Sequence, residues 1–452
     1  MLPVVEKYVV FPSVYPSNTE SVVTVVPCER CLVFADGEEC TVRVIAVDQY
    51  PPTETSVTFN VKAKDGVLKF THRFLDEQEY RIVVTKEDTE LISISLYSLD
   101  SDLYELTPLI GDLHSHSIRS DGRQDPTALA GYMRERGYDF FAMTDHHRYY
   151  PSEEVLDALS GLNSGIVPIL GEEVHVPNNP LHIVHLGGTA SVNEQYVKRR
   201  EEHDAEILEY EARVPDEIPE MYKAHYARAM WASEHIRAVG GLVVIPHPFW
   251  RPKGSKRHNV STEYAKIMLR SGLFDAYELI GAMSQQENNA SVALWTELRC
   301  EGVNIPVVGS SDVHGVQGSP EYPWQRTVAF AKEKNQKSIL EAIKKGFSAA
   351  VEITGVDYQT QYRAYGSLRL VNYVQFLMRY YFCKTERLAF GEGNAMRAYV
   401  MNDAQKALVE LQAAEAKRFT DRFFGRAEPP EISKEIIEKK TPFDNYHKEY
   451  TV

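Results

Sequence analysis

Short apolar segments that end abruptly in histidine, aspartate or glutamate are the feature that most constrains this 452-residue chain. The first is the stretch from Leu109 to Asp121, LIGDLHSHSIRSD, in which two histidines one residue apart follow an apolar run. At the end of a β-strand, side chains two positions apart point to the same face. His114 and His116 can therefore converge on one metal ion.

The same pattern recurs in strand-like segments that alternate with helical ones over residues 109 to about 350. Such alternation is typical of parallel strands joined by helices. The helical segments have recognisable start signals, such as Asp125 followed by Pro126, and Ser152 followed by two glutamates. Seven such units predict a (β/α) barrel, and an open doubly wound sheet is the alternative. The predicted strands cover residues 109–113, 139–143, 165–170, 181–186, 241–245, 276–280 and 305–308.

The segments on either side of this region have different patterns. Residues 1–107 contain short stretches rich in β-branched residues, separated by turn signals, and predict an antiparallel β-sandwich. Residues 356–452 contain apolar and amphipathic helical patterns and predict a helical extension. We therefore expect an α/β chain of three domains, at 1–107, 108–355 and 356–452.

Candidate metal ligands stand where six of the apolar segments end. In a parallel barrel the carboxyl ends of all strands emerge on one face, so these scattered side chains would line one pocket. Imidazole and carboxylate ligands suit zinc, manganese or iron, and at about four or five ligands per ion they fit two or three divalent ions. The segments offer His114, His116 and Asp121; His146 or His147; Glu172, Glu173 and His175; His182 and His185; His247; and Asp312 with His314.

These motifs resemble those of the PHP family, which is named for polymerase and histidinol phosphatase domains. The chain has DLHSHSIRSDG, MTDHH, LGEEVH, LHIVHLGG, PHPFW and GSSDVHG in the family's order, over about residues 109 to 350. The resemblance implies a distorted seven-stranded (β/α) barrel with a di- or trinuclear metal cluster. The metal ligands that it implies are His114, His116, Asp121, His146, Glu173, His182, His247, Asp312 and His314.

Two of these ligands have a competing neighbour. Glu172 competes with Glu173, which the G-x-E spacing from Gly171 favours, and His185 competes with His182. The N-terminal domain and the helical extension, with its YGSLRLVNY, resemble the branch of the family that includes carbaryl-hydrolase-like members.

The predicted cluster favours an anionic substrate, because three divalent cations outweigh its three carboxylates. Bound metal lowers the pKa of water from 15.7 toward about 7 and holds phosphoryl oxygens during attack. We therefore expect a metal-dependent phosphoesterase that acts on a small phosphorylated molecule. His175 and His185 are candidates for the proton donor to the leaving group, and Arg119 is a candidate for substrate contact.

Other residues near the predicted ligands are candidates for supporting roles. His147 and His175 are expected to line the pocket or support the ligands, and Asp112 and Asp145 either orient an imidazole or cap a strand end. The loop FWRPKGSKRH after His247 brings four basic residues to the pocket mouth, where they can bind a second phosphate or carboxylate: Arg251, Lys253, Lys256 and Arg257.

Composition limits the other classes of function. A net charge of −15 argues against a nucleic-acid groove, and no stretch approaches the roughly 20 apolar residues that cross a bilayer. Five scattered cysteines and no recognisable secretory signal indicate a cytoplasmic protein. Two alternatives remain: a carboxylic ester or carbamate hydrolase that uses the same metals, and a non-catalytic module that the metals only brace.

Overall fold

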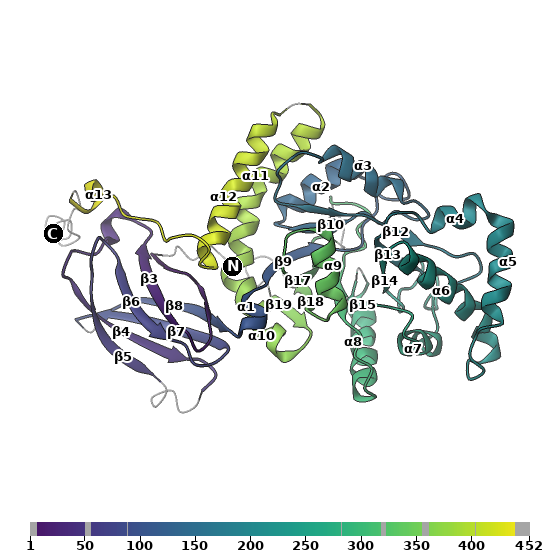
Figure 1. The fold of residues 1–452 in the computed structure, drawn as a ribbon, viewed down its shortest axis with the longest axis horizontal. Helices are drawn as coiled ribbons and strands as arrows, with labels where there is room; N and C mark the ends of the chain where they lie inside the picture. Colours follow the sequence, from purple (N-terminus) through teal and green to yellow (C-terminus); the bar gives the residue numbers. More distant parts are fainter. Residues whose placement is uncertain are drawn as a thin grey trace. The chain divides into compact units, whose positions relative to one another are not determined.

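A computed structural model describes residues 7–49, 56–87, 89–281, 283–317, 322–354, 361–402 and 404–438 (Figure 1). Residues 356–360, 403 and 439–452 of the predicted C-terminal segment lie outside the described residues. The chain forms two compact units, one made of Met1–Glu105 with Lys417–Val452 and the other of Leu106–Ala416. Most of the predicted helical extension thus belongs to the second unit, and its end belongs to the first.

The first unit contains two β-sheets that share one hydrophobic core. Their strand orders are β1-β3-β6 and β2-β8-β7-β4-β5. Alternate residues of β4 and β7, such as Val42, Val44, Ile82 and Val84, face this core, as the period of two in their sequences predicts. The strands are β1 (Tyr8–Phe11), β2 (Val14–Pro16), β3 (Glu20–Pro27), β4 (Glu39–Ala46), β5 (Val57–Lys62), β6 (Leu68–Arg73), β7 (Gln78–Lys86) and β8 (Thr89–Leu99).

The second unit contains a six-stranded sheet of order β11-β10-β9-β17-β18-β19 and a five-stranded sheet of order β12-β13-β14-β15-β16. Each of the seven predicted strands overlaps an observed one. The six-stranded sheet consists of β9 (Thr107–Asp112), β10 (Phe140–Ala142), β11 (Val167–Ile169), β17 (Gln325–Ala331), β18 (Ser348–Thr354) and β19 (Gln361–Tyr365). The five-stranded sheet consists of β12 (Gly171–Val174), β13 (Ile183–Gly187), β14 (Gly241–Ile245), β15 (Ala276–Ile280) and β16 (Val307–Gly309).

The strands of this unit are not all parallel, which differs from the sequence prediction. β12 pairs with β13 and β13 with β14 in antiparallel register, and β17 pairs antiparallel with both β9 and β18. β12 and β13 are joined by a short loop with no helix, and a parallel pair requires a longer crossover. Only Leu170 separates β11 from β12, so the chain passes there from one sheet to the other.

Strand β14 is buried on both sides, as its uninterrupted apolar sequence predicts. Val243 and Ile245 join one hydrophobic cluster, which includes residues of α6, α7 and α8. Leu242 and Val244 join a second cluster, which includes residues of both sheets and of α9 (Gln336–Lys344). The three helices are α6 (Glu220–Ala238), α7 (Thr262–Arg270) and α8 (Gln285–Cys300). This packing fixes the carboxyl end of β14, which leads directly to His247.

Helix α2 (Pro126–Glu135) begins as the sequence predicts, because the Asp125 carboxylate accepts hydrogen bonds from the N–H groups of Thr127 and Ala128. Helix α3 (Tyr150–Ala158) begins at Tyr150, so Ser152 lies inside its first turn and is not its cap. The prediction of a cap there was wrong, because the helix starts with Tyr150-Pro151.

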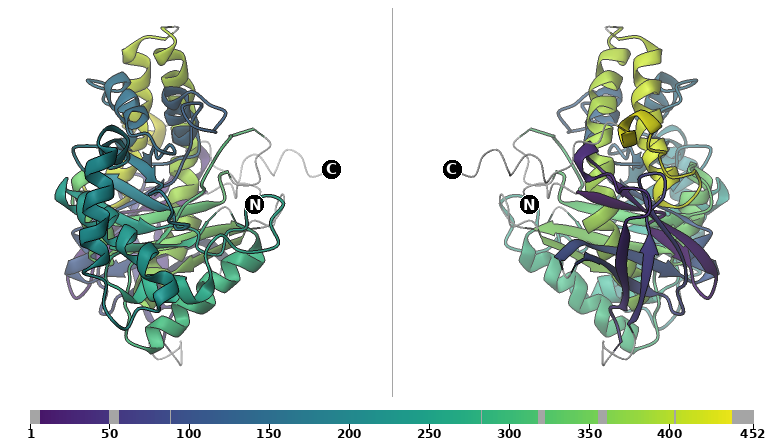
Figure 2. Two further views of the ribbon diagram at one scale, coloured as in Figure 1. Left: turned by 90° about the vertical axis from the view of Figure 1, so that its right-hand side faces the viewer. Right: turned by 90° about the vertical axis from the view of Figure 1, so that its left-hand side faces the viewer.

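Helix α2 packs closely on α11 (Cys383–Val400), and the two helices can be followed in Figure 2. A methyl group added at Gly393 would lie 2.5 Å from the carbonyl oxygen of Gly131, so two glycines permit this approach. The other helices of the C-terminal part are α10 (Leu368–Leu377), η3 (Met378–Phe382), α12 (Lys406–Phe423) and α13 (Lys434–Glu438). No helix in the described part of the chain has the length and apolar content needed to cross a membrane.

Candidate metal centre

Main-chain hydrogen bonds join four of the motifs directly beyond the strand ends. Ser115 forms a parallel bridge with Val313, and the N–H of His116 donates to the carbonyl of Val313 at 2.9 Å. On the other side, Thr144 N–H donates to Ser115 O at 2.9 Å. His146 and Glu173 form a second isolated bridge. The last, first, second and third motifs are therefore adjacent in space, although His116 and Val313 are far apart in sequence.

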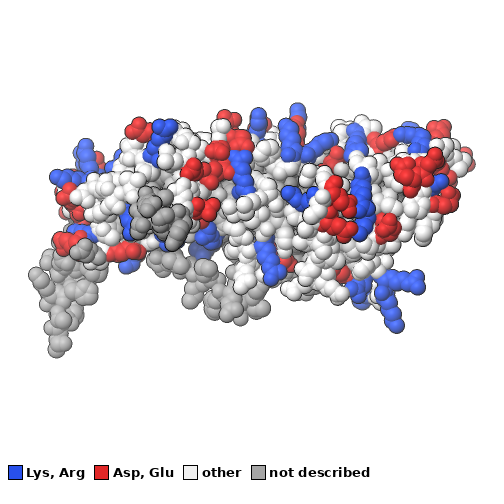
Figure 3. Space-filling model, turned by 90° about the horizontal axis from the view of Figure 1, so that it is seen from below, with Lys and Arg blue, Asp and Glu red and all other residues white. Residues whose placement is uncertain are grey.

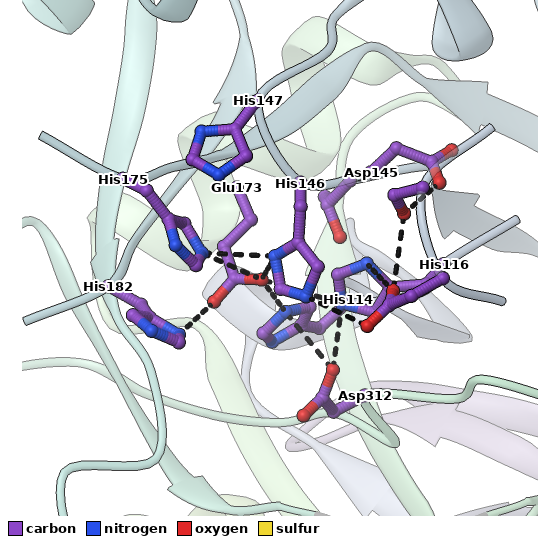
Figure 4. Close-up of polar contacts among 12 residues, drawn as sticks. His114, His116, Asp145, His146, His147, Glu173, His175, His182 and Asp312 are labelled. Atoms are coloured by element: carbon purple, nitrogen blue, oxygen red, sulfur yellow. Dashed lines mark hydrogen bonds and ion pairs between the residues drawn. The ribbon is translucent and has the colours of Figure 1, made fainter. Parts of the chain in front are cut away.

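Glu173 is the centre of the cluster of histidines and carboxylates (Figure 4). Its side chain is completely buried. One carboxylate oxygen, Oε1, lies 2.7 Å from His182 Nδ1 and 3.5 Å from His247 Nε2. The other, Oε2, lies 2.7 Å from His146 Nδ1 and 3.4 Å from His114 Nε2. We call the nine predicted ligands, which all lie in this region, the histidine–carboxylate cluster.

Two further carboxylates complete the histidine–carboxylate cluster. Asp312 Oδ1 lies 2.8 Å from His116 Nε2 and 3.4 Å from His114 Nε2. Asp121 Oδ2 lies 3.5 Å from His146 Nε2, and its Oδ1 lies 3.4 Å from His314 Nε2. The side chains form five overlapping groups whose ligand atoms lie within 4.8 Å of one another: His116, Asp121, His146 and His314; His114, His247 and Asp312; His114, His116 and Glu173; His146, Glu173 and His175; and Glu173, His182 and His247.

The geometry of the ligand atoms fits divalent metal ions. In a tetrahedral site with ligands about 2.1 Å from the ion, neighbouring ligand atoms are about 3.4 Å apart. The distances from His114 and His247 to Glu173 are 3.4 and 3.5 Å. Buried polar atoms normally have a hydrogen-bond partner. Several atoms that face one another in the cluster form no hydrogen bond of acceptable geometry: His114 Nε2, His116 Nε2, both Glu173 oxygens, His182 Nδ1 and Asp312 Oδ1.

Mutual attraction between the imidazoles and carboxylates shifts their pKa values. Burial alone would raise the pKa of Glu173, but His182 and His114 hold it well below its usual range. Burial alone would lower the pKa of His146 and His314, but the Asp121 carboxylate raises them, with Glu173 and Asp312 respectively, to about 10 and about 9. Without metal, protonated imidazoles therefore balance the negative charge of the carboxylates in the cluster. Bound cations would displace these protons.

Two residues of the cluster have left-handed backbone conformations that are uncommon for residues other than glycine. The φ angle is 22° at His247 and 49° at Asp312. Such angles are concentrated at sites where the surrounding structure holds a side chain in a functional position. Here they turn the side chains of the fifth and last motifs toward the cluster.

Glu278 supports His114 from behind and was not predicted. It lies in β15, and its Oε2 is 2.9 Å from His114 Nδ1, the ring nitrogen opposite the one that faces Glu173. A carboxylate in this position fixes the tautomer of a metal-binding imidazole. The available signal was the single charged residue within the apolar segment AYELI.

Asp112 and Asp145 hold main-chain segments and do not contact an imidazole ring. Asp112 Oδ1 accepts hydrogen bonds from the N–H groups of Ser311 at 3.0 Å and His114 at 3.2 Å, which ties the last motif to the first. Asp145 accepts from Ser117 Oγ at 2.7 Å and from Ser120. The sequence predicted that these residues either orient an imidazole or cap a strand end, and the structure shows the second role for both.

Glu172 and Glu173 lie on opposite faces of β12, as adjacent residues of a strand must. Glu172 Oε1 pairs with His185 Nδ1 at 3.1 Å in a fully buried site, and its Oε2 accepts from Ser191 Oγ at 2.7 Å. The structure therefore does not bring His185 to the cluster. His185 is therefore too far from the cluster to act there as the predicted proton donor. Of the two competing histidines it is His182, which lies before β13, that reaches Glu173.

Asn193, in α4 (Asn193–Lys198), connects these two sides of β12 and was not predicted. Its Nδ2 donates both to Glu172 Oε2 and to the main-chain carbonyl of Glu173, each at 3.0 Å. Its Oδ1 accepts from the N–H of His175 at 3.3 Å. The side chain is completely buried, so it fixes the backbone that carries Glu173 and His175.

The two remaining predicted catalytic residues have different surroundings. His175 lies at the edge of the cluster, with its Nε2 3.0 Å from His146 Nδ1 and its ring stacked on His182. His147 lies behind it and contacts Tyr196.

Arg119 forms a two-pronged ion pair with Glu154, at 2.9 and 3.0 Å, which occupies its guanidinium group. The structure shows no contact between Arg119 and the cluster.

Comparison with known proteins agrees with the motif pattern. Residues 112–274 match the family model of the PHP domain. A segment of 56 residues is 39% identical to the DNA polymerase/3'-5' exonuclease PolX of Bacillus subtilis (strain 168), which is 12% of this chain but only 10% of that protein.

Solved structures with a detectable likeness include a two-domain protein from Bacteroides vulgatus ATCC 8482 that contains a predicted PHP-like metal-dependent phosphoesterase. That chain is 18% identical, with 58% of this chain and 76% of that chain covered, and a TM-score of 0.38. An amidohydrolase from Chromobacterium violaceum is 17% identical, over 47% of this chain and 90% of that chain, with a TM-score of 0.31.

Proposed function

We propose that this protein is a metal-dependent hydrolase that cleaves phosphoester bonds of a small phosphorylated substrate. One observation carries the proposal: ligand-type side chains from six separated motifs meet around the buried Glu173. Five of the six motifs lie within residues 112–274, which match the PHP domain, and the last motif lies beyond them. A group of buried imidazoles and carboxylates of this size has a large electrostatic cost in a protein with no cation to bind.

We propose two or three ions of zinc, manganese or iron. His116, Asp121, His146 and His314 form one group of ligands, and His114, His247 and Asp312 form another. Glu173 with His182 belongs to a third group and borders both of the others. When bound, such ions lower the pKa of water and neutralise phosphoryl oxygens.

The chain's own residues orient the ligands and handle protons. Glu278 keeps the proton of His114 on Nδ1, so that Nε2 offers its lone pair toward Glu173 and Asp312. His175 is partly exposed at the edge of the cluster, and we propose it as the proton donor to the leaving group. Its position beside His146 supports this role. We do not extend the proposal to His185 or Arg119.

We propose that the second unit is a distorted seven-stranded barrel of the PHP type. Strands β12 to β16 form one sheet, and β9 pairs with β10. The bridges between His146 and Glu173 and between Ser115 and Val313 join these two sets of strands at both ends, which supports a ring of seven. The narrower likeness to carbaryl-hydrolase-like members and the three-domain division remain predictions.

We propose a small molecule as the substrate, with no nucleic acid or membrane as partner. The net charge of −15 supports this choice. Figure 3 shows acidic and basic side chains interspersed over the face seen from below, without a broad basic surface on that face. A cytoplasmic location remains a prediction.

The test is hydrolysis by protein loaded in turn with zinc, manganese and iron. 4-Nitrophenyl phosphate, bis(4-nitrophenyl) phosphate and 4-nitrophenyl acetate share a leaving group and report monoesterase, diesterase and carboxylesterase activity. We expect turnover of at least one phosphate ester that exceeds turnover of the acetate. Faster hydrolysis of the acetate would favour the carboxylic ester alternative, and no hydrolysis despite stoichiometric metal would favour the non-catalytic one.

A further inference from the structure

A hollow of about 430 Å³ lies beside the loop that follows His247. Its lining is mainly basic and consists of Arg251, Lys256, Arg257, His258, Val260 and Ser261. Ser261 caps helix α7, because its Oγ accepts from the N–H of Tyr264. The positive end of this helix dipole therefore adds to the positive charge at the hollow.

The cations of this hollow are not neutralised equally. Arg251 forms an ion pair with Glu287 at 3.2 Å. Lys256 and Arg257 form no ion pair with any residue that the structure describes, in a chain whose net charge is −15. His258 packs edge-on against Phe249, which holds its ring at the wall. Two free cations with an oriented imidazole form a site for a compact anion.

The same loop is attached to the histidine–carboxylate cluster. The ring of Trp250 lies 5.7 Å from that of His182 and 5.8 Å from that of His247. Asn259 N–H donates to Trp250 O at 2.8 Å, so the chain between them forms a closed loop. The loop leaves the carboxyl end of β14, which is also the end that carries His247. The loop that supplies most of the lining of the hollow is thus anchored beside two ligands of the cluster.

We propose that this hollow binds a second anionic group, a phosphate or a carboxylate, of the substrate whose phosphoester lies at the cluster. The assignment rests on the proposed function and narrows its substrate class to small phosphoesters with two anionic ends. Lys256 and Arg257 supply the charge, and the Ser261 end of α7 supplies main-chain dipoles. Arg251 keeps the loop in place through Glu287.

The test compares three matched series of substrates. These are n-alkyl monophosphates, α,ω-alkanediol bisphosphates and ω-carboxyalkyl phosphates of two to six carbons (about the span of a small metabolite), with phosphate release as the measurement. We expect kcat/KM to be about tenfold higher or more when a second anionic group is present, with a maximum at one chain length. The bisphosphate and carboxylate series show which group the hollow prefers.

Variants locate this preference in the loop. K256A/R257A should reduce the ratio of kcat/KM between substrates with two anionic groups and those with one by about tenfold. K253A is the matched control, because Lys253 is a cation of the same loop that does not line the hollow. Its ratio should equal that of the wild-type protein. An equal ratio in K256A/R257A would overturn the assignment and leave the proposed function intact.

A binding measurement separates the two proposals if no ester is hydrolysed. Calorimetry with propane-1,3-diol bisphosphate measures the hollow without any turnover. Binding that weakens about tenfold in K256A/R257A and not in K253A would keep the anion site. Equal binding to all three proteins, or no binding to the wild-type protein, would overturn it.

Discussion

Glu278 Oε2 lies 2.9 Å from Nδ1 of His114, and both side chains are buried. The other ring nitrogen of His114 faces Glu173 and Asp312. The carboxylate therefore holds the imidazole in the orientation and tautomer that a metal ion requires. Carboxylates placed in this way commonly change metal affinity by one or two orders of magnitude.

We predict that Glu278→Gln lowers the affinity for the most weakly held ion by about tenfold to a hundredfold. The glutamine keeps the volume of the side chain but loses the charge that fixes the proton on Nδ1. Competition with a chromophoric chelator measures the affinity. Glu301→Gln is the control, because Glu301 pairs with Arg270 at the surface. Equal affinities in both variants would contradict the role of Glu278.

Replacement of Asn193 should loosen the backbone around Glu173. Asn193→Ala removes donors from Glu172 and from the carbonyl of Glu173 in a buried site, which costs about 1–3 kcal/mol of unfolding free energy. We expect a Tm lower by several degrees, together with weaker metal binding, in thermal unfolding and chelator competition. Asn304→Ala, at an exposed position, should change neither. A lower Tm with unchanged metal affinity would show that Asn193 supports only the fold.

Loss of a cluster ligand should remove metal and turnover together. His116→Ala takes a member from two groups of ligands and Asp312→Asn takes one from a third group, so at least one ion should be lost from each variant. Elemental analysis and hydrolysis of 4-nitrophenyl phosphate measure the two effects. Circular dichroism should still report folded protein, since the first unit has its own core. Full metal content and activity in either variant would move the site elsewhere.

The pH dependence of stability should change direction when metal binds. In the metal-free protein His146 and His314 have pKa values of about 10 and about 9, above the unfolded value of about 6.5. Their contribution is complete below pH ~6.5 and is lost as the pH rises through the folded values. The pKa values of Asp121 and Glu173 are lowered, so their contribution exists above pH ~4.5 and is lost as the pH falls.

The Tm of the metal-free protein should therefore fall as the pH rises from about 6.5 toward 9. Metal ions require unprotonated imidazoles, so the Tm of the loaded protein should rise from pH 6.5 toward pH 8. Thermal scans with a chelator and with each metal test this difference. A chelated protein whose Tm increases steadily from pH 6.5 to 9 would contradict it.

Much of the site was predictable because strand ends have a simple sequence pattern. An apolar run followed by histidine or aspartate places the side chain at a strand end, as at His247 after β14. The choice of Glu173 over Glu172 followed from spacing, and the structure places these two on opposite faces of β12. Strand β12 itself was not predicted, because its sequence contains two adjacent glutamates and so lacks the apolar pattern of a buried strand.

The remaining features depend on contacts between distant parts of the chain. The pairing of Glu278 with His114 joins two strands and has no local signal except a charge in an apolar segment. The placement of His185 depended on which face of β13 packs against Glu172. The mixed strand directions arose from the short connection between β12 and β13, and no propensity of individual residues encodes such a connection.

The bridge between Ser115 and Val313 has a consequence for how the protein is made. The histidines of the first motif and the acid of the last one take their positions only when these two main-chain segments pair. A nascent chain that still lacks Val313 has no partner for Ser115 and no Asp312. The complete set of ligands can therefore assemble only after synthesis has passed Val313, well into the second unit.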